Sequence, residues 1–292
     1  MSSLSPADHR CTVESNTPCD SRPGNPACLY VIRFRTECPD FNAEPGQFVM
    51  IDLPESAFFF RRPMSILAVP EPGVFEVFYK VMGRGTRRMA EIRPGDIIRV
   101  LAPLGNAFAP PAAGEKLLLV GGGIGMAPLY CWAGRHAASA GGVYGVYGAR
   151  SVADLGPTVR IESVFHPDRF RFTTDDGSLG FTGNVCQFLE SAPDWVTGVQ
   201  RVLVCGPTPM MRATVALVKR LNPACRVEVS LEEHMPCGTG ACTGCVVRRA
   251  DQLLPSKVCV EGPVFEASQL VWEDAWADVM PSQPCAAKEV CR

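Results

Sequence analysis

The sequence predicts three structural units in succession: a small antiparallel β-barrel, an α/β domain with an open and mostly parallel sheet, and a short cysteine-rich domain. Three observations lead to this prediction: short β-rich runs separated by Pro-Gly pairs, then strands that alternate with helices, then four closely spaced cysteines. A chain of 292 residues is long enough for two or three domains. The expected boundaries are 1–24 for a flexible arm, 25–110 for the barrel, 111–225 for the α/β domain, 226–273 for the cysteine-rich domain and 274–292 for a tail.

Composition and charge exclude several classes of partner. The net charge is −2, and 28 basic residues are mixed with 30 acidic ones, so no polybasic run indicates nucleic acid or an anionic membrane surface. The uncharged segment 117–134 is long enough to approach a membrane span, but its three consecutive glycines and its proline favour a nucleotide-binding loop. The first residues contain no apolar signal region, so we expect a cytoplasmic protein whose 14 cysteines are thiols or metal ligands.

The first third of the chain predicts a poorly ordered arm followed by barrel strands. Residues 1–24 contain three prolines and two cysteines without a hydrophobic period, which is typical of a disordered segment. A short helix is expected at 85–92, between the fourth and fifth strands. The five expected strands cover residues 28–35, 47–53, 64–69, 74–81 and 96–102.

Two motifs in this barrel could bind a cofactor. Residues 61–65 (RRPMS) place cations and a hydroxyl at the start of a strand, which suits a diphosphate and the edge of a flavin ring. The alternative is a solvated edge strand that begins with proline. Residues 83–86 (GRGT) form a tight turn whose free amides could bind phosphate. The alternative there is a plain turn with Thr86 as the helix cap.

The middle of the chain predicts a dinucleotide site. Strands are expected at 116–120, 141–149, 169–176 and 201–205, and helices after Pro128, at 184–191 and at 209–221. The sequence VGGGIGMAPL follows the first of these strands and leads into a helix, so its glycines would let the backbone approach a pyrophosphate. Its pattern is G-x-G-x-x-P rather than G-x-G-x-x-G.

Two later loops fall at the carboxyl ends of strands, where open α/β sheets bind ligands. They are residues 174–178 and 205–210. Cys205 could lie beside a nicotinamide, or it could be a buried structural thiol. Asp175 and Asp176 could equally be turn formers.

The strongest chemical signal is the spacing of four cysteines. Cys237, Cys242 and Cys245 follow C-x4-C-x2-C, with Cys259 further along, and this matches the plant-type [2Fe-2S] pattern. Glycines between the ligands suit a loop that wraps a cluster with φ > 0. The alternative is a zinc site or a disulfide pair, although zinc ribbons usually show two C-x2-C knuckles. The segment is too small for its own core, so a bound cluster should supply part of its folding free energy.

The order of these motifs resembles the ferredoxin-NADP reductase superfamily, and within it the electron-transfer subunits of two-subunit, NAD-dependent dihydroorotate dehydrogenases. The resemblance covers about residues 27–272 and rests on RRPMS, GRGT, GGGIGMAPL, TDDGSLGFTG, CGPTPMM and CGTGACTGC with KVCVEGPVF. It implies an FAD site at Arg62, Pro63, Met64, Ser65, Tyr79, Lys80, Val81, Gly85 and Thr86. It implies that the pyridine nucleotide, NAD(H), faces Gly121, Gly122, Gly123, Gly125, Cys205, Gly206 and Pro207. It implies a [2Fe-2S] cluster on Cys237, Cys242, Cys245 and Cys259.

The resemblance also implies a function. A flavin takes two electrons as a hydride and a [2Fe-2S] cluster carries one at a time, so the chain would convert two-electron into one-electron transfer. No catalytic base is evident, so dihydroorotate chemistry would belong to a separate FMN-bearing catalytic subunit in a hetero-oligomer of pyrimidine (UMP) biosynthesis. Apolar residues flanking the cysteines are expected in part to dock that subunit. They are Met235, Phe265, Leu270, Val271 and Trp272.

Some features keep alternatives open. Glu261 stands where the family pattern suggests aspartate, and the arm and tail extend beyond the usual limits. The chain could be the flavin subunit of a hydrogenase or of a ferredoxin-NADP reductase complex, although Cys237 stands where some of those relatives have aspartate. It could also be a zinc-stabilised binding module. NADH is expected over NADPH, because Arg150 is the only obvious cation after the second strand of the α/β domain.

Overall fold

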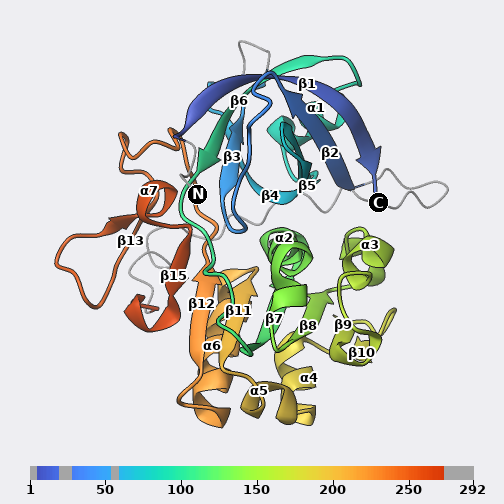
Figure 1. Cartoon of the computed structure of the whole chain (residues 1–292), viewed down its shortest axis with the longest axis vertical. Coiled ribbons are helices and arrows are strands. Elements are labelled where there is room, and N and C mark those ends of the chain that lie inside the picture. Colours follow the sequence, from blue (N-terminus) through green and yellow to red (C-terminus); the bar gives the residue numbers. More distant parts are fainter. Residues whose placement is uncertain (1–4, 20–27, 54–58, 273–292) are drawn as a thin grey trace.

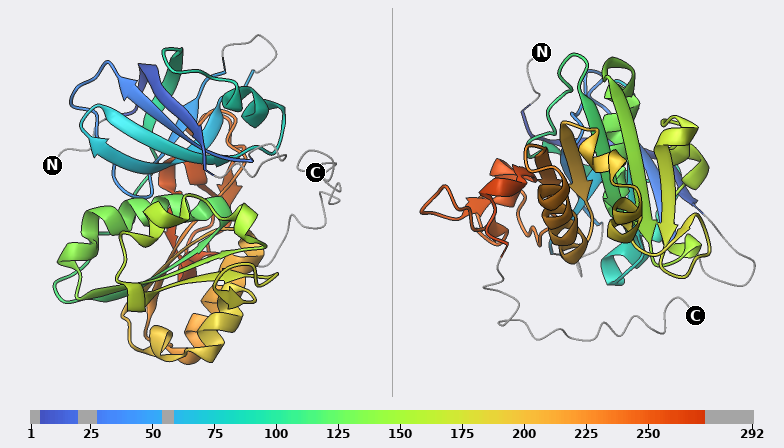
Figure 2. Two further views of the ribbon diagram at one scale, coloured as in Figure 1. Left: turned by 90° about the vertical axis from the view of Figure 1, so that its right-hand side faces the viewer. Right: turned by 90° about the horizontal axis from the view of Figure 1, so that it is seen from below.

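The computed structural model describes residues 5–19, 28–53 and 59–272. A closed antiparallel barrel lies above an α/β sheet, and the cysteine-containing segment projects from the side of both (Figures 1 and 2). The strand order in the barrel is β1-β2-β5-β4-β3-β6. Its elements are β1 (Ala7–Pro18), β2 (Leu29–Thr36), β3 (Phe48–Ile51), β4 (Arg62–Glu71), β5 (Val74–Lys80), α1 (Arg84–Ala90) and β6 (Ile97–Leu104). The predicted barrel is therefore confirmed.

The predicted flexible arm is wrong for residues 7–18, because they form β1. This strand pairs antiparallel with both β2 and β6 and so closes the barrel. Only Cys11 and Val13 are fully buried along it, which is too few apolar positions to produce a recognisable period. Backbone pairing on both sides holds the strand instead, and the Asn16 amide donates hydrogen bonds to the carbonyls of Met89 and Ile92 at 2.8 and 3.1 Å.

The second sheet has seven strands in the order β10-β9-β8-β7-β11-β12-β15. Its first six strands run parallel, and β15 is antiparallel to β12. The strands are β7 (Lys116–Gly122), β8 (Gly142–Ala149), β9 (Phe170–Thr174), β10 (Phe181–Thr182), β11 (Arg201–Cys205), β12 (Arg226–Ser230) and β15 (Val264–Glu266). The helices are α2 (Met126–His136), α3 (Thr158–Glu162), α4 (Val185–Ser191), α5 (Asp194–Thr197), α6 (Thr208–Leu221) and α7 (Val258–Glu261). Single 3₁₀ turns are η1 (Gly123–Gly125), η2 (Ala137–Ser139), η3 (Val152–Asp154), η4 (Pro167–Arg169) and η5 (Ala267–Gln269).

Apolar side chains cover both faces of this sheet, as a parallel sheet between helices requires. Along β7, Leu118 and Val120 pack in one core with α4 and α6, whereas Leu117 and Leu119 pack in another with α2 and α3. Helix α2 lies between the sheet and the barrel (Figure 1), and its Trp132 is fully buried. The predicted α/β architecture is confirmed.

The sheet extends further along the chain than the sequence predicted. We expected residues from 226 onward to form a separate cysteine-rich domain, but β12 and β15 are strands of this sheet. Between them the chain leaves the sheet to form the cysteine loop, the two-stranded β13 (Val246–Val247) and β14 (Ser256–Lys257), and α7. The misplaced boundary arose because the short run RVEVS is not followed by a helix, so the strand-helix alternation stops there.

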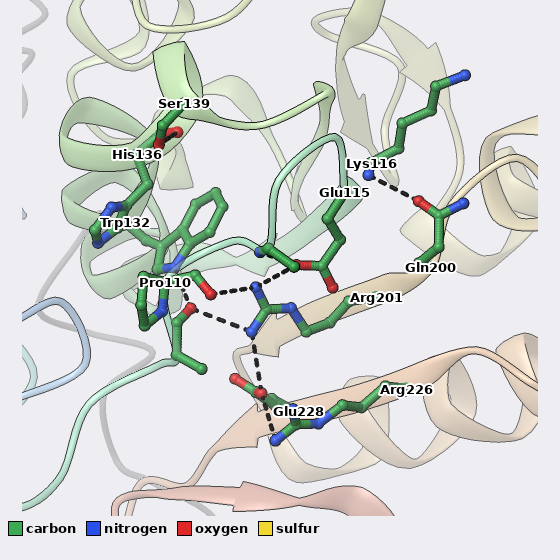
Figure 3. A network of polar contacts seen from close by, with 12 residues as sticks. Pro110, Glu115, Lys116, Trp132, His136, Ser139, Gln200, Arg201, Arg226 and Glu228 are labelled. Atoms are coloured by element: carbon green, nitrogen blue, oxygen red, sulfur yellow. Dashed lines mark hydrogen bonds and ion pairs between the residues drawn. The ribbon is translucent and has the colours of Figure 1, made fainter.

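A buried ionic network anchors the base of the sheet (Figure 3). Arg201, 2% exposed at the start of β11, donates to Glu115 at 2.9 Å and to Glu228 at 3.3 Å. The same guanidinium also donates to the carbonyls of Ala109 and Pro110, in the segment that joins the barrel to the sheet. The network therefore ties the interdomain connection to β11 and β12.

The structure also tests the expectations about a membrane span and about the cysteines. Among the described residues, no helix is long and apolar enough to cross a membrane. Ten cysteines in the described segments, Cys19 not counted, are free thiols, but Cys28 is disulfide-bonded, so the expectation that every cysteine would be a thiol or a ligand is wrong at this position.

Candidate functional site

A cavity of about 180 Å³ lies where the barrel, the parallel sheet and the segment after β12 meet. Its lining includes residues from both barrel motifs, from the glycine loop and from the loop after β11, although these motifs are far apart in the sequence. The barrel contributes Pro63, Met64, Ser65, Lys80 and Thr86, the sheet contributes Ile124, Gly125, Cys205 and Ser230, and the next segment contributes Leu231, Glu232, Glu233 and Met235.

The two barrel motifs touch each other beside this cavity. A Cβ on Gly85 would stand 2.3 Å from Nε of Arg62, so only a glycine lets this guanidinium lie against the start of α1. The Thr86 hydroxyl accepts hydrogen bonds from the amides of Met82 and Gly83 at 2.8 and 3.1 Å. Thr86 therefore acts as a cap, as the alternative interpretation proposed, while it also lines the cavity.

Lys80 links the barrel side of the cavity to the sheet. Its ammonium lies 2.5 Å from the carboxylate of Asp154, which belongs to η3 after β8. Asp154 also accepts from Arg150 at 3.2 Å, so the cation singled out for nucleotide choice is already paired. Hydrogen bonds from Lys80 and Arg150 oppose the effect of burial and hold the pKa of Asp154 below its usual value.

Two predicted flavin residues do not reach the cavity. Tyr79 is fully buried inside the barrel, where its hydroxyl donates to Asn16 at 3.0 Å and its ring stacks on Tyr30. Its side chain is thus part of the barrel core, because alternate residues of β5 face opposite sides. The Val81 amide donates to the carbonyl of Cys28, and its side chain packs against the barrel core.

On the sheet side, a glycine brings two loops into contact. A Cβ on Gly125 would lie 2.6 Å from the carbonyl carbon of Cys205, so no larger residue fits between η1 and the loop after β11. Gly122 similarly leaves room for Met210, whose sulfur would lie 2.5 Å from an added Cβ. These glycines therefore bring the two loops that the sequence assigned to the nucleotide together at one edge of the sheet.

The other glycines of this motif have different surroundings. Gly121 packs on Met126, and Gly123 has φ +55° with open space around its Cα. Of the four predicted glycines, only Gly125 lines the first cavity. Gly206 and Pro207 line a second one.

That second cavity, of about 570 Å³, adjoins the first. Its walls include the start of β4, the loop after β11 and the segment after β12. The two cavities share Pro63, Glu232, Glu233 and Met235. Arg62, which the sequence assigned to the flavin, lines only the second.

Cys205 at the end of β11 stays protonated. Burial and the nearby charge of Glu232 raise the pKa of its thiol to about 12, although a hydrogen bond with Ser230 acts the other way. It lines the cavity and is 6% exposed, so it combines both interpretations that the sequence left open.

The four predicted cysteines form two pairs. The thiols of Cys237 and Cys242 are within hydrogen-bonding reach of each other, and so are those of Cys245 and Cys259. Two pairs suit a two-iron cluster, in which each iron takes two protein ligands. No three His, Cys, Asp or Glu side chains within the described ranges form a group that could hold a single metal ion.

The loop around these thiols presents amides to sulfur. Gly238 and Gly240 have φ +72° and +80°, as the sequence predicted for a wrapped loop. The Thr239 amide donates to the sulfur of Cys237 at 3.4 Å, and the Cys259 amide donates to Cys245 at the same distance. Such hydrogen bonds favour thiolates, the form that binds iron.

Comparison with known proteins decides the family. Residues 232–271 match the family described as the iron-sulfur cluster binding domain of dihydroorotate dehydrogenase B. Two relatives bear the name dihydroorotate dehydrogenase B (NAD(+)), electron transfer subunit. The protein of Desulforamulus reducens is 37% identical over 79% of this chain and 88% of its own length, and that of Enterococcus faecalis is 33% identical over 83% and 92%. The chain belongs to the family of dihydroorotate dehydrogenase B electron transfer subunits.

Solved structures agree with this family. The structure of an NADH-dependent reduced ferredoxin-NADP oxidoreductase, studied for flavin-based electron bifurcation, has a TM-score of 0.74 and 28% identity over 89% of each chain. A ferredoxin reductase of carbazole 1,9a-dioxygenase, at 22% identity and a TM-score of 0.63, shows the same fold over 76% of this chain and 68% of its own. The predicted membership of the dihydroorotate dehydrogenase B family, within a ferredoxin-NADP reductase fold, is confirmed.

Sequence reasoning missed one group of residues at the site of this dihydroorotate dehydrogenase B subunit. Ser230, Leu231, Glu232 and Glu233 line the cavity at the carboxyl end of β12. The rule that ligands bind at the carboxyl ends of parallel strands would have found them, had RVEVS been recognised as a strand of the sheet.

Three of the five apolar residues that were expected in part to dock a subunit are buried within the chain. Met235, Phe265 and Leu270 are 7%, 4% and 8% exposed and pack in the core shared by the sheet and the barrel. The chain folds back onto the larger domains, so these apolar residues are buried without a partner.

Proposed function

We propose that this chain transfers electrons between NAD(H) and the FMN-bearing catalytic subunit of dihydroorotate dehydrogenase B, through FAD and a [2Fe-2S] cluster, in pyrimidine biosynthesis. The observation that carries this proposal is the cavity at the meeting point of the flavin motif, the nucleotide loops and the segment leading to the cysteines. There FAD and the nicotinamide nucleotide would lie side by side, and the segment after β12 would lead from them to the cluster.

The barrel residues would bind and orient FAD, which supplies the exchange between hydride and single electrons when bound. Arg62 at the second cavity offers a planar cation for the diphosphate. Ser65 and the 63–64 backbone stand at the first cavity, where the flavin ring edge would lie. Much of the cavity wall is apolar, which suits a flavin ring.

The sheet residues would hold the nicotinamide nucleotide against that ring. Gly125 and Gly206 let the backbone of two loops come close, and Cys205 lines the space between them and the barrel. We infer NADH rather than NADPH, because Arg150 is engaged by Asp154 and the part of the chain that the structure describes offers no cluster of cations there.

The cysteine segment would hold the cluster and bring it to the partner. Phe59 and Phe60 are 91% and 49% exposed and line a hollow together with Pro236, Cys237 and Cys242. Exposed aromatic side chains beside a ligand loop are suited to a protein interface. We therefore propose that the catalytic subunit covers this face.

From the order of the strands we propose three structural units. They are a barrel with β1 to β6, the seven-stranded sheet with its helices, and a cysteine insertion between β12 and β15. Ten cysteines in the described ranges are free thiols, as is usual in a reducing compartment, so we infer a cytoplasmic location.

The test is co-expression with the cognate FMN-bearing subunit, followed by size-exclusion chromatography and cofactor analysis. We expect one hetero-oligomeric peak that contains FAD, FMN and two irons per chain and that supports NADH-linked orotate reduction. The chain alone should reduce artificial acceptors with NADH and leave orotate unchanged. A complex without orotate activity, but active between NADPH and ferredoxin, would assign the chain to the ferredoxin-NADP oxidoreductase relatives instead.

A further inference from the structure

The overall reaction proposed above moves unequal numbers of protons and electrons. Oxidation of NADH yields NAD⁺, one proton and two electrons, and a [2Fe-2S] cluster accepts only the electrons, one at a time. One proton must therefore leave the cavity for every two electrons that reach the cluster. In the opposite direction one proton must enter. The inference below rests on the proposed function and identifies the group that carries this proton.

The side chains that line the first cavity offer few candidates. Cys205 holds its proton, because burial and a neighbouring carboxylate raise its pKa to about 12. Lys80 is held in an ion pair with Asp154 at 2.5 Å. The hydroxyls of Ser65, Thr86 and Ser230 are too weakly acidic to release a proton near neutral pH. Only the two carboxyl groups of Glu232 and Glu233 remain.

Glu232 has the better position of the two. Its charge acts on the thiol of Cys205, so its carboxylate stands close to the end of β11, on the nucleotide side of the cavity. The Glu232 side chain borders the cavity and is accessible to water, yet many protein atoms surround it. This burial raises the pKa of Glu232, and burial likewise raises that of Glu233, with His234 acting in the opposite sense on both. A carboxyl group whose pKa moves toward neutrality can both accept and donate a proton.

The same two carboxyl groups also provide a route outward. Both line the first cavity and the second, and the second reaches His234, which is exposed. The wall of the second cavity opposite them carries two guanidinium groups. The charged and titratable groups that face Glu232 are Arg61, Arg62, Lys80, Cys205, Glu233 and His234.

We propose that Glu232 is the proton-transfer residue of the flavin cavity and that Glu233 relays the proton between it and the exposed side at His234. In the direction of NADH oxidation, the Glu232 carboxylate takes the proton that stays behind when electrons pass to the cluster. In the direction of NAD⁺ reduction, the protonated carboxyl group gives one proton for each pair of arriving electrons. No other oxidant or reductant is needed, since the proton comes from or goes to water.

The test uses the complete complex with FAD and cluster, and compares Glu232→Gln with Glu232→Asp and Glu233→Gln. The Gln variant keeps the size and polarity of the side chain but cannot carry a proton. We expect proton release, followed with a pH indicator in weak buffer during NADH oxidation, to slow about 100-fold in Glu232→Gln, the lower range for general acid-base catalysis. NADH affinity should stay within about twofold. Glu232→Asp should recover most of the rate, and Glu233→Gln should show a smaller loss.

A matched control is Glu37→Gln, which removes an exposed carboxylate paired with Arg10 outside both cavities and should change nothing. A second measurement is the carbon-13 NMR titration of Glu232 in protein without cofactors, where a pKa above that of exposed glutamates is expected. Unchanged proton release in Glu232→Gln would overturn the proposal. If Glu232→Gln fails to retain FAD, the titration decides, and a Glu232 pKa equal to that of exposed glutamates would refute the proposal. Loss of NADH oxidation in the unmodified complex would instead refute the proposed function.

Discussion

In the seven-stranded sheet, the amino ends of the parallel strands form the base and their carboxyl ends form the top edge, and the two carry different kinds of residue. Strand β11 shows both within five residues. At its start, Arg201 is buried in a network of carboxylates and carbonyls that closes the base. At its end, Cys205 faces a cavity, and glycines hold the neighbouring loops close. Arg201 and Glu228 at the base are 2% and 3% exposed, whereas the top lines a cavity. The difference shows that one edge sets stability and the other leaves room for chemistry.

At the base, the burial of charged groups costs free energy. Arg201 Nε and Glu228 Oε2 are buried without a hydrogen-bond partner, although both groups are otherwise paired. A buried ion pair is weak evidence for stability by itself, because desolvation offsets much of the attraction. Its evident effect here is to fix the barrel connection at 109–110 against the sheet, which sets how the cavity walls meet.

The largest expected effect lies beyond the top edge, at the cysteines. Cys259→Ala should abolish cluster assembly, because it removes one of the two thiols of a pair, and it should destabilise the insertion that the cluster supports. Iron and sulfide analysis checks this against Cys38→Ser, which changes a free cysteine of the barrel side. Two irons retained in Cys259→Ala would show that the fourth ligand is another residue.

The base should respond in stability. Arg201→Ala removes the buried cation of Glu228 and Glu115, leaves only the half-exposed Arg226 to pair with Glu228, and should lower the free energy of unfolding by about 3 kcal/mol. The double variant Arg201→Met with Glu228→Leu should lose less, because the buried Glu228 carboxylate is removed together with its buried cation. Denaturant titration gives both values. If Arg201→Ala kept the stability of the parent protein but lost nucleotide binding, the assignment of stability to the base and of ligand binding to the top would be wrong.

At the barrel side of the cavity the effect should be on cofactor affinity. Arg62→Ala should weaken FAD binding by about 1.5–3 kcal/mol, the range for a charge-assisted hydrogen bond. Fluorescence titration of the flavin-free protein measures it. Arg10→Ala, at an exposed ion pair of the same barrel, is the control and should bind FAD normally.

At the top edge, adding one methyl group to a glycine should lower NADH affinity where that glycine is in close contact with the neighbouring loop. Gly125→Ala places a Cβ 2.6 Å from the backbone of Cys205, and overpacking of this kind costs about 1–3 kcal/mol. NADH affinity should fall as the two loops are pushed apart. Gly134→Ala on α2, where nothing lies within 4 Å, is the matched control and should stabilise slightly. Equal behaviour of the two variants in NADH titrations would refute the close-contact role of Gly125.

The smallest expected effect concerns the ion pair between Lys80 and Asp154. The pKa of Asp154 is lowered, so the stabilisation is present above its unfolded value of 3.8 and is lost as pH falls through the folded value. Both side chains are partly exposed, so we expect about 1 kcal/mol or less. Asp154→Asn should lack this component, which thermal unfolding at pH 6 and pH 3 would reveal. A constant difference between variant and parent at both pH values would contradict it.

Sequence reasoning succeeded where chemistry is local and failed where it depends on pairing between distant strands. The cysteine spacing and the glycine loop predicted their elements because a few adjacent residues determine each one. Strand β1 was missed because its stability comes from backbone bonds to β2 and β6, not from its own apolar period. The register of β5 turns the Tyr79 ring into the barrel, which the sequence motif did not predict. Glu232 was missed for the same reason, since its significance depends on β12 belonging to the sheet.

The position of the cysteine insertion between β12 and β15 has a consequence for engineering. Both ends of the insertion leave from neighbouring, hydrogen-bonded strands, with Ser230 opposite Val264. The two points of attachment are therefore fixed at one strand spacing, about 4.8 Å, whatever the chain does in between. A segment of different length or ligand set could be exchanged here as a cassette without changing the order of the strands. The fold thus separates the cysteine insertion, through which electrons would leave, from the barrel and sheet, between which the hydride would be transferred.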